Sequence, residues 1–387
     1  MIAVAGTNGK GSSVAMLAAI CRAAGYRVGS YTSPHLVDVR ERFAIDAQPV
    51  EAPRLIEAFE RIEAHPDGGS LTYFEWLTVA AFLVFAAAEA DVWVLEVGLG
   101  GRLDAVNALD ADLALITAIG LDHQDWLGDS REAIGREKAG ILRPGQPAVY
   151  VDTDPVDSVL ETGRMLGARL RSLGAEVELG PLSTDGLEVV TPEGRRRHAL
   201  PALHGAHQRR NAAGVVALLA HPDCSLTVSD EAIDTGLRAV AVTGRMEVVE
   251  RAGRSIVLDV AHNGEAARAL AESLGPLEGG RRLAVFSALA DKPVGEVVAP
   301  MIDRVDAWWV AGLSVPRAMP ADELARVIAL AGGVEIHCES GLIPAYNAAF
   351  DAASPGDEIL IFGSFHVVGP LRQRLHPADN GRRGNAP

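Results

Sequence analysis

Short apolar runs alternate with longer segments of helical spacing along the first half of the chain. Four runs rich in β-branched residues predict strands at 27–31, 91–97, 112–119 and 148–152. Three longer segments predict helices at 13–24, 53–64 and 74–90. Because strands that alternate with helices build a mainly parallel sheet covered on both faces, the pattern predicts an α/β fold.

A second series of the same kind predicts a further α/β domain of Rossmann-like type. Its strands are expected at 254–259, 282–287, 306–311 and 358–363. Residues 170–200 alternate more weakly and contain several Gly, Pro and Arg, which is typical of a small β-rich extension. We therefore expect a central domain over 1–243 that includes this extension, a C-terminal domain over 244–376 and a disordered tail over 377–387.

Composition narrows the class of protein. The chain has 387 residues, 48% of them hydrophobic, which suffices for real cores. A net charge of -16 argues against binding to nucleic acid or anionic membranes. Its most apolar run, 79–88, is shorter than the ~20 residues that cross a bilayer.

The cysteines and the N-terminus indicate the cellular compartment in which the protein works. Cys21, Cys224 and Cys338 lie far apart and show neither a disulfide framework nor zinc-ligand spacing. A glycine-rich loop occupies the place where a signal peptide needs an apolar core, so export is not expected. We expect a monomeric, cytoplasmic protein.

A glycine-rich turn with a single lysine follows the first apolar run. It reads Val4-Ala5-Gly6-Thr7-Asn8-Gly9-Lys10-Gly11-Ser12-Ser13. Glycines let backbone N–H groups turn inward around an anion, and the following helix N-terminus and Lys10 add positive charge. Ser12 or Ser13 then offers a hydroxyl to magnesium. We expect residues 6–13 to bind phosphate; the alternative is a turn without chemical importance.

This loop is shorter than the common P-loop, and it resembles that of the Mur ligases, ATP-dependent enzymes that join a carboxylate to an amine. Further segments resemble, in order, the signatures of the folylpolyglutamate synthase family: 32–36, 95–104, 121–128, 136–141, 207–213, 244–245, 259–263 and 363–366. Agreement at 70–75 and around Trp126 looks most like the bifunctional bacterial branch, whose members are also dihydrofolate synthases.

The resemblance implies a magnesium site. Ser33, Glu96 and His123 would hold the ion, with Ser12 near the nucleotide-bound metal. Glu96 ends an apolar strand, where its carboxylate could bind a hard cation or simply cap the strand in solvent. Without the resemblance, Asp122-His123 is more typical of a polar loop, because imidazole is an unusual magnesium ligand.

The resemblance also implies roles for Lys138, Asn211 and Phe74. Lys138 would react with carbon dioxide to form a carbamate that organises the magnesium site, whereas a helical lysine is usually exposed and ion-paired. Asn211 resembles the adenine-contacting asparagine of the family, and the alternative is a helix N-cap. Phe74 would stack on a pterin ring, and the alternative is an ordinary core position.

In the second domain, Arg245, Asp259 and His262 complete the candidate set. Arg245 could neutralise charge on the γ-phosphate, and it could also be a surface arginine. Asp259 and His262 follow a strand and could close over the nucleotide. The alternative is a strand-end turn built on Asp259 and Asn263-Gly264.

The chemistry that the family implies is acyl-phosphate formation. ATP would phosphorylate a carboxylate, and an amine would displace phosphate to give an amide. The implied substrates are dihydropteroate and L-glutamate in one reaction, and a reduced folate and L-glutamate in the other. A ligase for another carboxylate, such as a cell-wall precursor, and an ATP-binding protein that has lost ligase activity remain alternatives.

Three features depart from the family pattern. Gly264 follows Asn263 where proline is usual, Thr243 instead of proline precedes Gly244, and the chain starts at its first strand. Family members carry further residues ahead of that strand, which contribute to the pteroate site. We therefore expect weaker recognition of dihydropteroate than of folates.

Overall fold

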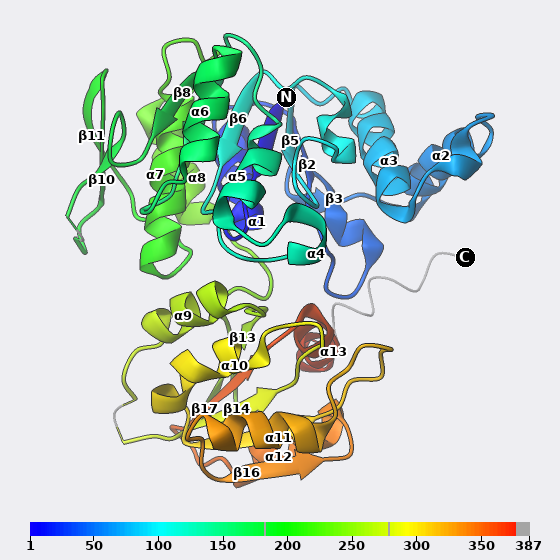
Figure 1. Cartoon of the computed structure of the whole chain (residues 1–387), viewed down its shortest axis with the longest axis vertical. Helices are drawn as coiled ribbons and strands as arrows, with labels where there is room; N and C mark the ends of the chain where they lie inside the picture. Colours follow the sequence, from blue (N-terminus) through cyan, green and yellow to red (C-terminus); the bar gives the residue numbers. More distant parts are fainter. Residues whose placement is uncertain (182, 278, 377–387) are drawn as a thin grey trace. The chain divides into compact units, whose positions relative to one another are not determined.

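The structure is a computed structural model that describes residues 1–181, 183–277 and 279–376. The chain divides into two compact units, Met1–Ala241 and Val242–Pro387. Figure 1 shows the elements of both units, and each unit is described by itself. The tail expected at 377–387 lies outside the described residues.

The first unit is built on a large sheet with the strand order β4-β3-β2-β5-β1-β6-β7-β8 over its described residues. Neighbouring strands from β2 to β8 are parallel, and β3 and β4 are antiparallel additions at one edge. The strands are β1 (Ile2–Ala5), β2 (Val28–Tyr31), β3 (Phe43–Ile45), β4 (Gln48–Pro49), β5 (Val92–Glu96), β6 (Leu113–Ile116), β7 (Pro147–Tyr150) and β8 (Arg169–Ser172).

Helices cover both faces of this sheet (Figure 1). On one face α1 (Lys10–Ala23) packs against α7 (Ala206–Leu219) and α8 (Asp230–Ala239). The other face carries α2 (Ala52–Glu63), α3 (Tyr73–Ala87), α5 (Arg131–Ala139) and α6 (Asp157–Leu166). Short helical turns complete the unit: η1 (Val39–Arg42), η2 (Gly68–Ser70), η3 (Ala105–Ala108) and α4 (Gln124–Leu127).

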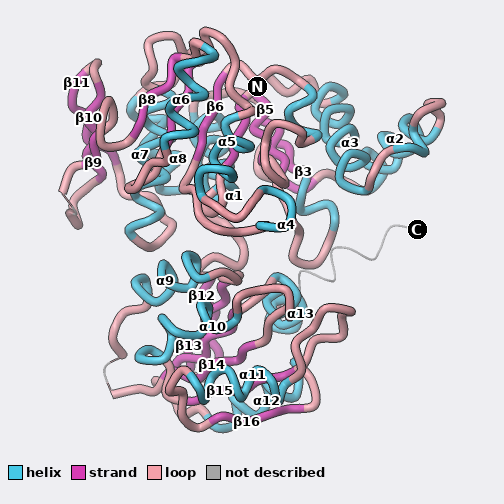
Figure 2. Tube along the Cα trace, viewed as in Figure 1, coloured by secondary structure: helices cyan, strands magenta, loops and turns pink. Residues whose placement is uncertain are grey.

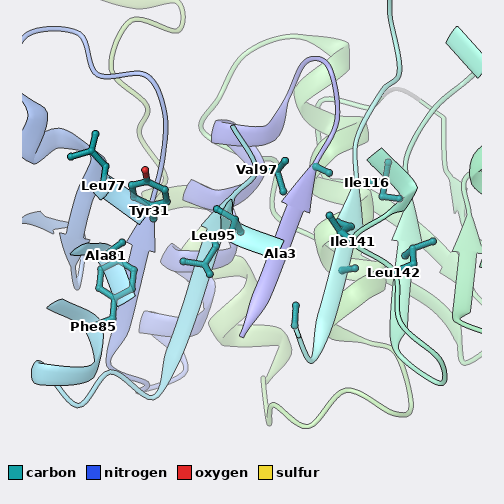
Figure 3. Close-up of a cluster of buried hydrophobic side chains, with 14 of the residues drawn as sticks. Ala3, Tyr31, Leu77, Ala81, Phe85, Leu95, Val97, Ile116, Ile141 and Leu142 are labelled. Atoms are coloured by element: carbon teal, nitrogen blue, oxygen red, sulfur yellow. The ribbon is translucent and has the colours of Figure 1, made fainter. Parts of the chain in front are cut away.

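Alternation along β1 explains why two cores form. Ala3 and Ala5 point into the cluster shown in Figure 3, whereas the alternating Ile2 and Val4 are buried on the opposite face. In the same cluster Phe85 of α3 lies against β2 at Gly29, where an added Cβ would be 2.6 Å from the ring. Glycine at 29 therefore makes room for a fully buried aromatic ring.

The extension expected at about 170–200 contains two different structures. β8 joins the large sheet beside β7, because its register continues the parallel ladder. Further along the chain, β9 (Glu178–Leu179), β10 (Leu187–Thr191) and β11 (Gly194–His198) form a three-stranded antiparallel sheet of their own.

The second unit is a separate α/β layer structure, and Figure 2 shows its strands between helices. Its sheet has the order β12-β13-β17-β14-β15-β16 over the described residues, and only the edge strand β12 is antiparallel. The strands are β12 (Glu247–Arg251), β13 (Arg254–Asp259), β14 (Arg282–Phe286), β15 (Ala307–Ala311), β16 (Ile336–Glu339) and β17 (Glu358–Phe362). The helical segments are α9 (Gly264–Ser273), α10 (Val294–Val298), η4 (Ala299–Arg304), α11 (Ala321–Leu330), α12 (Leu342–Ala352) and α13 (Phe365–Leu375).

The predicted α/β class is confirmed. The strand expected at 112–119 is shorter than predicted. β6 ends at Ile116, Thr117 still donates to Ala5 of β1, and Ala118 and Gly120 bind the phosphate loop at Thr7 instead of a strand. Both edge strands of the second unit, β12 and β16, were not predicted because their polar residues lack a clear apolar alternation. Among the described residues, no helix is long and apolar enough to cross a membrane.

Replacement of Phe85 by alanine tests the core of the first unit. The ring is fully buried and 5.8 Å from the Trp93 ring, so Phe85→Ala leaves a cavity that the neighbours cannot fill. We expect the free energy of unfolding to fall by about 3–5 kcal/mol. Urea unfolding followed by circular dichroism measures this change. Met165→Ala, at a side chain that is 79% exposed, is the control, and an equal loss there would contradict the assignment.

Candidate active site

The candidate residues of the first unit gather where its parallel strands end. The loop 6–13 follows β1, Ser33 follows β2, and Glu96 is the last residue of β5. β1 lies between β5 and β6, with Val4 opposite Glu96 and Ala5 opposite Ile116. Because the carboxyl ends of parallel strands meet at one edge, segments far apart in the sequence are brought together there.

The backbone of the glycine-rich loop passes very close to its neighbours. Gly6 has a φ of +145°, and a Cβ at this position would lie 1.8 Å from Thr117 Oγ1. Gly9 has a φ of +91°, and its Cβ would lie 2.7 Å from the Asn211 amide. Only glycine fits at either position. Directly after Gly9, α1 begins at Lys10 without a side-chain cap, so its first N–H groups point toward the loop.

The polar side chains of this loop have different partners. Lys10 Nζ donates to the carbonyls of Gly6 at 3.0 Å and Thr7 at 3.2 Å, so the ammonium lies over the loop. Ser13 Oγ donates to the Gly9 carbonyl at 2.9 Å. Ser12 Oγ accepts from Gln208 Nε2 at 3.1 Å and keeps a second lone pair. Ser12 therefore suits a metal ion better than Ser13.

Glu96 and Ser33 are brought together beside the loop. Glu96 is 5% exposed, and its Oε2 accepts from the Ser33 backbone N–H at 3.1 Å. A Cβ on Gly11 would lie 3.5 Å from the same oxygen, which places the carboxylate next to the first turn of α1. The alternative of a solvated strand cap is therefore wrong for Glu96.

His123 lies on a less enclosed part of the edge. It precedes α4 in a left-handed conformation with φ 53°, and its side chain is 49% exposed. Its Nε2 is 4.0 Å from Asp122 Oδ1. Within the described residues, His, Cys, Asp and Glu form no group of three suited to a metal. The candidate ligands are thus the Glu96 carboxylate, serine hydroxyls and the His123 imidazole. Magnesium would also need phosphate and water oxygens, which it readily takes.

Lys138 is buried near the end of α5 and not exposed as an ordinary helical lysine would be. It is 5% exposed, and burial together with the nearby Lys10 lowers its pKa to about 7, against the attraction of Asp122 and Asp104. Burial therefore favours the neutral amine at Lys138 far more than in an exposed lysine. The alternative of a surface ion pair is wrong.

Asp104 is a site residue to which sequence reasoning assigned no role. Its carboxylate accepts from the backbone N–H groups of Leu99 and Val106 at 2.9 Å each. Burial raises its pKa, and these amides together with Lys10 oppose the rise. The available signal was an aspartate two residues after Gly101-Arg102, in the turn that follows β5.

Phe74 and Asn211 occupy defined positions. Phe74 is partly buried at the rim of the core, 6.1 Å from the Tyr31 ring, and a Cβ on Gly98 would be 2.4 Å from it. Asn211 lies inside α7, 3% exposed and against Gly9, so the N-cap alternative is wrong. The pterin and adenine roles of these residues stay predictions.

Arg245, Asp259 and His262 lie together within the second unit, around the end of β13. Asp259 accepts from the backbone N–H groups of Met246 at 3.0 Å and Ala261 at 2.8 Å. Burial raises the pKa of Asp259, and the charge of Arg245 opposes the rise. His262 Nδ1 is 2.8 Å from the Val260 carbonyl. Asp259 thus does organise a strand-end turn, as the alternative held, and Arg245 is half-buried beside it. The roles of Arg245, Asp259 and His262 at the nucleotide stay predictions.

A glycine-rich loop with a lysine at the carboxyl edge of a parallel sheet is typical of a nucleotide-phosphate site. Together with a second α/β unit and the family matches that follow, it makes this chain an ATP-dependent ligase of the Mur type. Residues 4–219 match the Mur ligase middle domain, and residues 244–365 match the Mur ligase glutamate ligase domain. The chain belongs to the dihydrofolate synthase/folylpolyglutamate synthase family of the Mur ligases.

One named relative and two solved structures are similar to nearly the whole of this chain. The dihydrofolate synthase/folylpolyglutamate synthase of Escherichia coli K12 is 37% identical over 379 residues, covering 98% of this chain and 87% of the relative. The structure of Escherichia coli FolC with DHPP and ADP matches with a TM-score of 0.89 and 36% identity over 99% of this chain and 89% of that one. A bifunctional synthase with Mn, AMPPNP and L-glutamate bound matches with a TM-score of 0.88 and 39% identity over 97% of this chain and 89% of that one.

Replacement of Glu96 by glutamine tests the magnesium site. Glutamine keeps the size of the side chain and an acceptor for the Ser33 N–H, but removes the negative charge. We expect the Mg²⁺ concentration for half-maximal activity to rise roughly ten-fold or more, because a carboxylate is the preferred magnesium ligand. A magnesium titration of ADP release measures this. Glu60→Gln on the exposed side of α2 is the matched control, and an unchanged titration for Glu96→Gln would remove Glu96 from the site.

Proposed function

We propose that this chain joins L-glutamate to dihydropteroate and to the γ-carboxylate of reduced folates, with conversion of ATP to ADP and phosphate. The observation that carries the proposal is the phosphate loop with the buried carboxylate of Glu96 beside it and the buried Lys138 near its Lys10, in a chain 37% identical to a bifunctional synthase. Relatives solved with ADP, AMPPNP, Mn and L-glutamate support the same substrates and a divalent cation.

The reaction divides into two displacements. A carboxylate oxygen of the pterin substrate attacks the γ-phosphorus, ADP leaves, and an acyl phosphate forms. The α-amine of L-glutamate then attacks the acyl carbon, phosphate leaves, and the amine loses a proton to give the amide. Both steps need stabilisation of phosphoryl charge and little covalent chemistry from the protein.

Within the first unit, the loop 6–13 would bind the phosphates through its N–H groups and Lys10. Ser33, Glu96 and His123 would hold magnesium, which supplies charge neutralisation at the phosphates. Asn211 would contact adenine, and Phe74 would stack on the pterin. These positions fit because each one borders the loop or the strand end beside it, except His123, which is more open.

The residues of the second unit would act on the nucleotide. Arg245 is the candidate to neutralise the γ-phosphate, with Asp259 holding its turn in place through Met246. His262 would close over the nucleotide together with Asp259. The support is their common position at the end of β13 and their match to the family pattern.

Lys138 is proposed to carry a carbamate. Its ammonium would first lose one proton, and the neutral amine would then attack carbon dioxide and lose a second proton, so that a buried cation becomes a carbamate anion near Lys10. The pKa of about 7 supports this, because the reacting amine must be neutral. The resulting carboxylate would help to organise the magnesium site.

Small molecules are the proposed partners, and we propose that the chain works as a monomer in the cytoplasm without binding nucleic acid. A net charge of -16 and a pI near 5.1 support the absence of nucleic-acid binding, since phosphate backbones attract basic surfaces. Cys21, Cys224 and Cys338 are all free thiols, which is consistent with a reducing compartment.

Glutamate-dependent ADP release tests the function. We expect release that requires both L-glutamate and either dihydropteroate or a reduced folate, with products heavier by one glutamate in mass spectrometry. Lys10→Ala is the negative control. It should be folded but inactive, because it removes charge from the phosphate loop without removing packing from a core. Turnover only with a nucleotide-linked muramyl substrate, or ATP binding without turnover, would overturn the proposal.

The carbamate makes a separate prediction for Lys138. Lys138→Ala should be inactive and regain part of its activity with small carboxylates such as acetate, which restore an anion in the space left by the side chain. The assay is ADP release with and without acetate, with Lys10→Ala as a variant that acetate should not rescue. Full activity of Lys138→Ala in carbonate-free buffer would refute the carbamate.

A further inference from the structure

The segment 118–120 connects β6 to Asp122 and His123, and side chains and loops from three other parts of the unit hold its backbone. It lies outside any helix or strand. Buried backbone N–H and C=O groups outside a sheet need other hydrogen-bond partners. Here the partners are Thr7, Arg131 and Asp152. The segment is therefore held in one place although it belongs to no regular element.

Thr7 of the phosphate loop holds both ends of this segment. Its backbone N–H donates to the Ala118 carbonyl at 2.8 Å. Its Oγ1 donates to the Gly120 carbonyl at 3.1 Å and accepts from the Gly120 N–H at 3.0 Å. The Thr7 hydroxyl is thus engaged with the protein, and its role is to join the phosphate loop to the loop of His123.

Ile119, between those two residues, is held by Arg131 and Asp152. The Ile119 N–H donates to Asp152 Oδ2 at 2.8 Å, and Arg131 Nε donates to the Ile119 carbonyl at 2.7 Å. Arg131 Nη2 also donates to Asp152 Oδ2 at 3.3 Å. These three bonds form a closed ring that includes both backbone groups of Ile119.

The ring is anchored in the interior. Asp152 is 5% exposed, and its Oδ2 accepts a third bond from the Tyr150 hydroxyl at 3.2 Å, at the end of β7. A buried carboxylate with several donors and a guanidinium beside it has a strongly preferred geometry. The end of β7 therefore determines where Ile119 lies.

The same arginine begins the helix that carries Lys138. Arg131 is the first residue of α5, and Lys138 follows seven residues later, two turns along the same face. Movement of Arg131 would displace the loop of His123 and the helix of Lys138 at the same time.

We propose that Arg131 and Asp152 are positioning residues for the magnesium site, which fix the loop of His123 and the helix of Lys138 through Ile119. The inference rests on the proposed function, because it takes His123 as a magnesium ligand. Arg131 and Asp152 would then do more than stabilise the fold. Their hydrogen bonds hold Ile119 in the loop before His123, and Arg131 also begins the helix that carries Lys138.

Arg131→Lys and Asp152→Asn separate positioning from stability. Lysine keeps the charge but lacks the planar fork that reaches the Ile119 carbonyl and Asp152 together. We expect affinity for Mn²⁺, measured by electron paramagnetic resonance of free Mn²⁺ with the ADP-bound protein, to fall roughly ten-fold in each variant. Tyr150→Phe removes one bond to Asp152 and should give a smaller fall in the same direction, which keeps the test valid if the stronger variants do not fold.

The matched control is Arg171→Lys. Arg171 binds Glu193 through two bonds of 2.6 and 2.5 Å on β8, at the far edge of the sheet, so its loss should lower the melting temperature without changing Mn²⁺ affinity. Equal effects of Arg171→Lys and Arg131→Lys on Mn²⁺ would overturn the positioning role.

His123→Ala distinguishes the two proposals. If His123→Ala weakens Mn²⁺ binding and neither Arg131→Lys nor Asp152→Asn does, the positioning role fails while the metal site stands. If His123→Ala leaves Mn²⁺ binding unchanged, the assignment of His123 fails and the inference fails with it. Weakened binding in all three variants supports both.

Discussion

The close approach of the phosphate loop to its neighbours is the constraint on which the first unit depends. Gly6 leaves no room for a side chain beside Thr117, and Gly9 leaves none beside Asn211. The loop can have this course only because β1 lies between β5 and β6, so that Glu96 and Thr117 flank it. Helix α7, on the same face of the sheet as α1, then places Asn211 against Gly9. A nucleotide site of this kind is thus a property of the sheet order and not of the loop alone.

Buried carboxylates at strand ends organise both units in the same way. Glu96 at the end of β5 accepts from the backbone of Ser33, and Asp259 at the end of β13 accepts from the backbone of Met246 and Ala261. Each carboxylate therefore holds the loop that carries candidate phosphate or metal ligands. Burial without such donors would be costly, and the N–H groups offset part of that cost. In the first unit, Lys10 and the N-terminus of α1 place positive charge beside the loop where phosphate would bind.

Much of the fold could be predicted from the sequence because the signals are local. The alternation of strands and helices predicted two α/β units, and the strands at 254–259, 282–287, 306–311 and 358–363 are present with ends within one residue of those expected. The glycine-rich turn, its lysine and the following helix were also readable, since the conformational freedom of glycine and the charge of lysine belong to the residues themselves. The edge strands β12 and β16 were missed because their residues are partly polar on both faces.

What the sequence determined by itself is the set of elements and the chemistry available at each turn, since these follow from periodicity and residue type. Only the tertiary structure decided that Lys138 is buried near Lys10, that Asn211 lies inside a helix, and that Thr7 binds the loop of His123. The ring of Arg131, Asp152 and Ile119 was likewise invisible along the chain. The physical reason is that burial, pKa and hydrogen-bond direction depend on which distant residues meet, and the order of strands in the sheet decides those meetings.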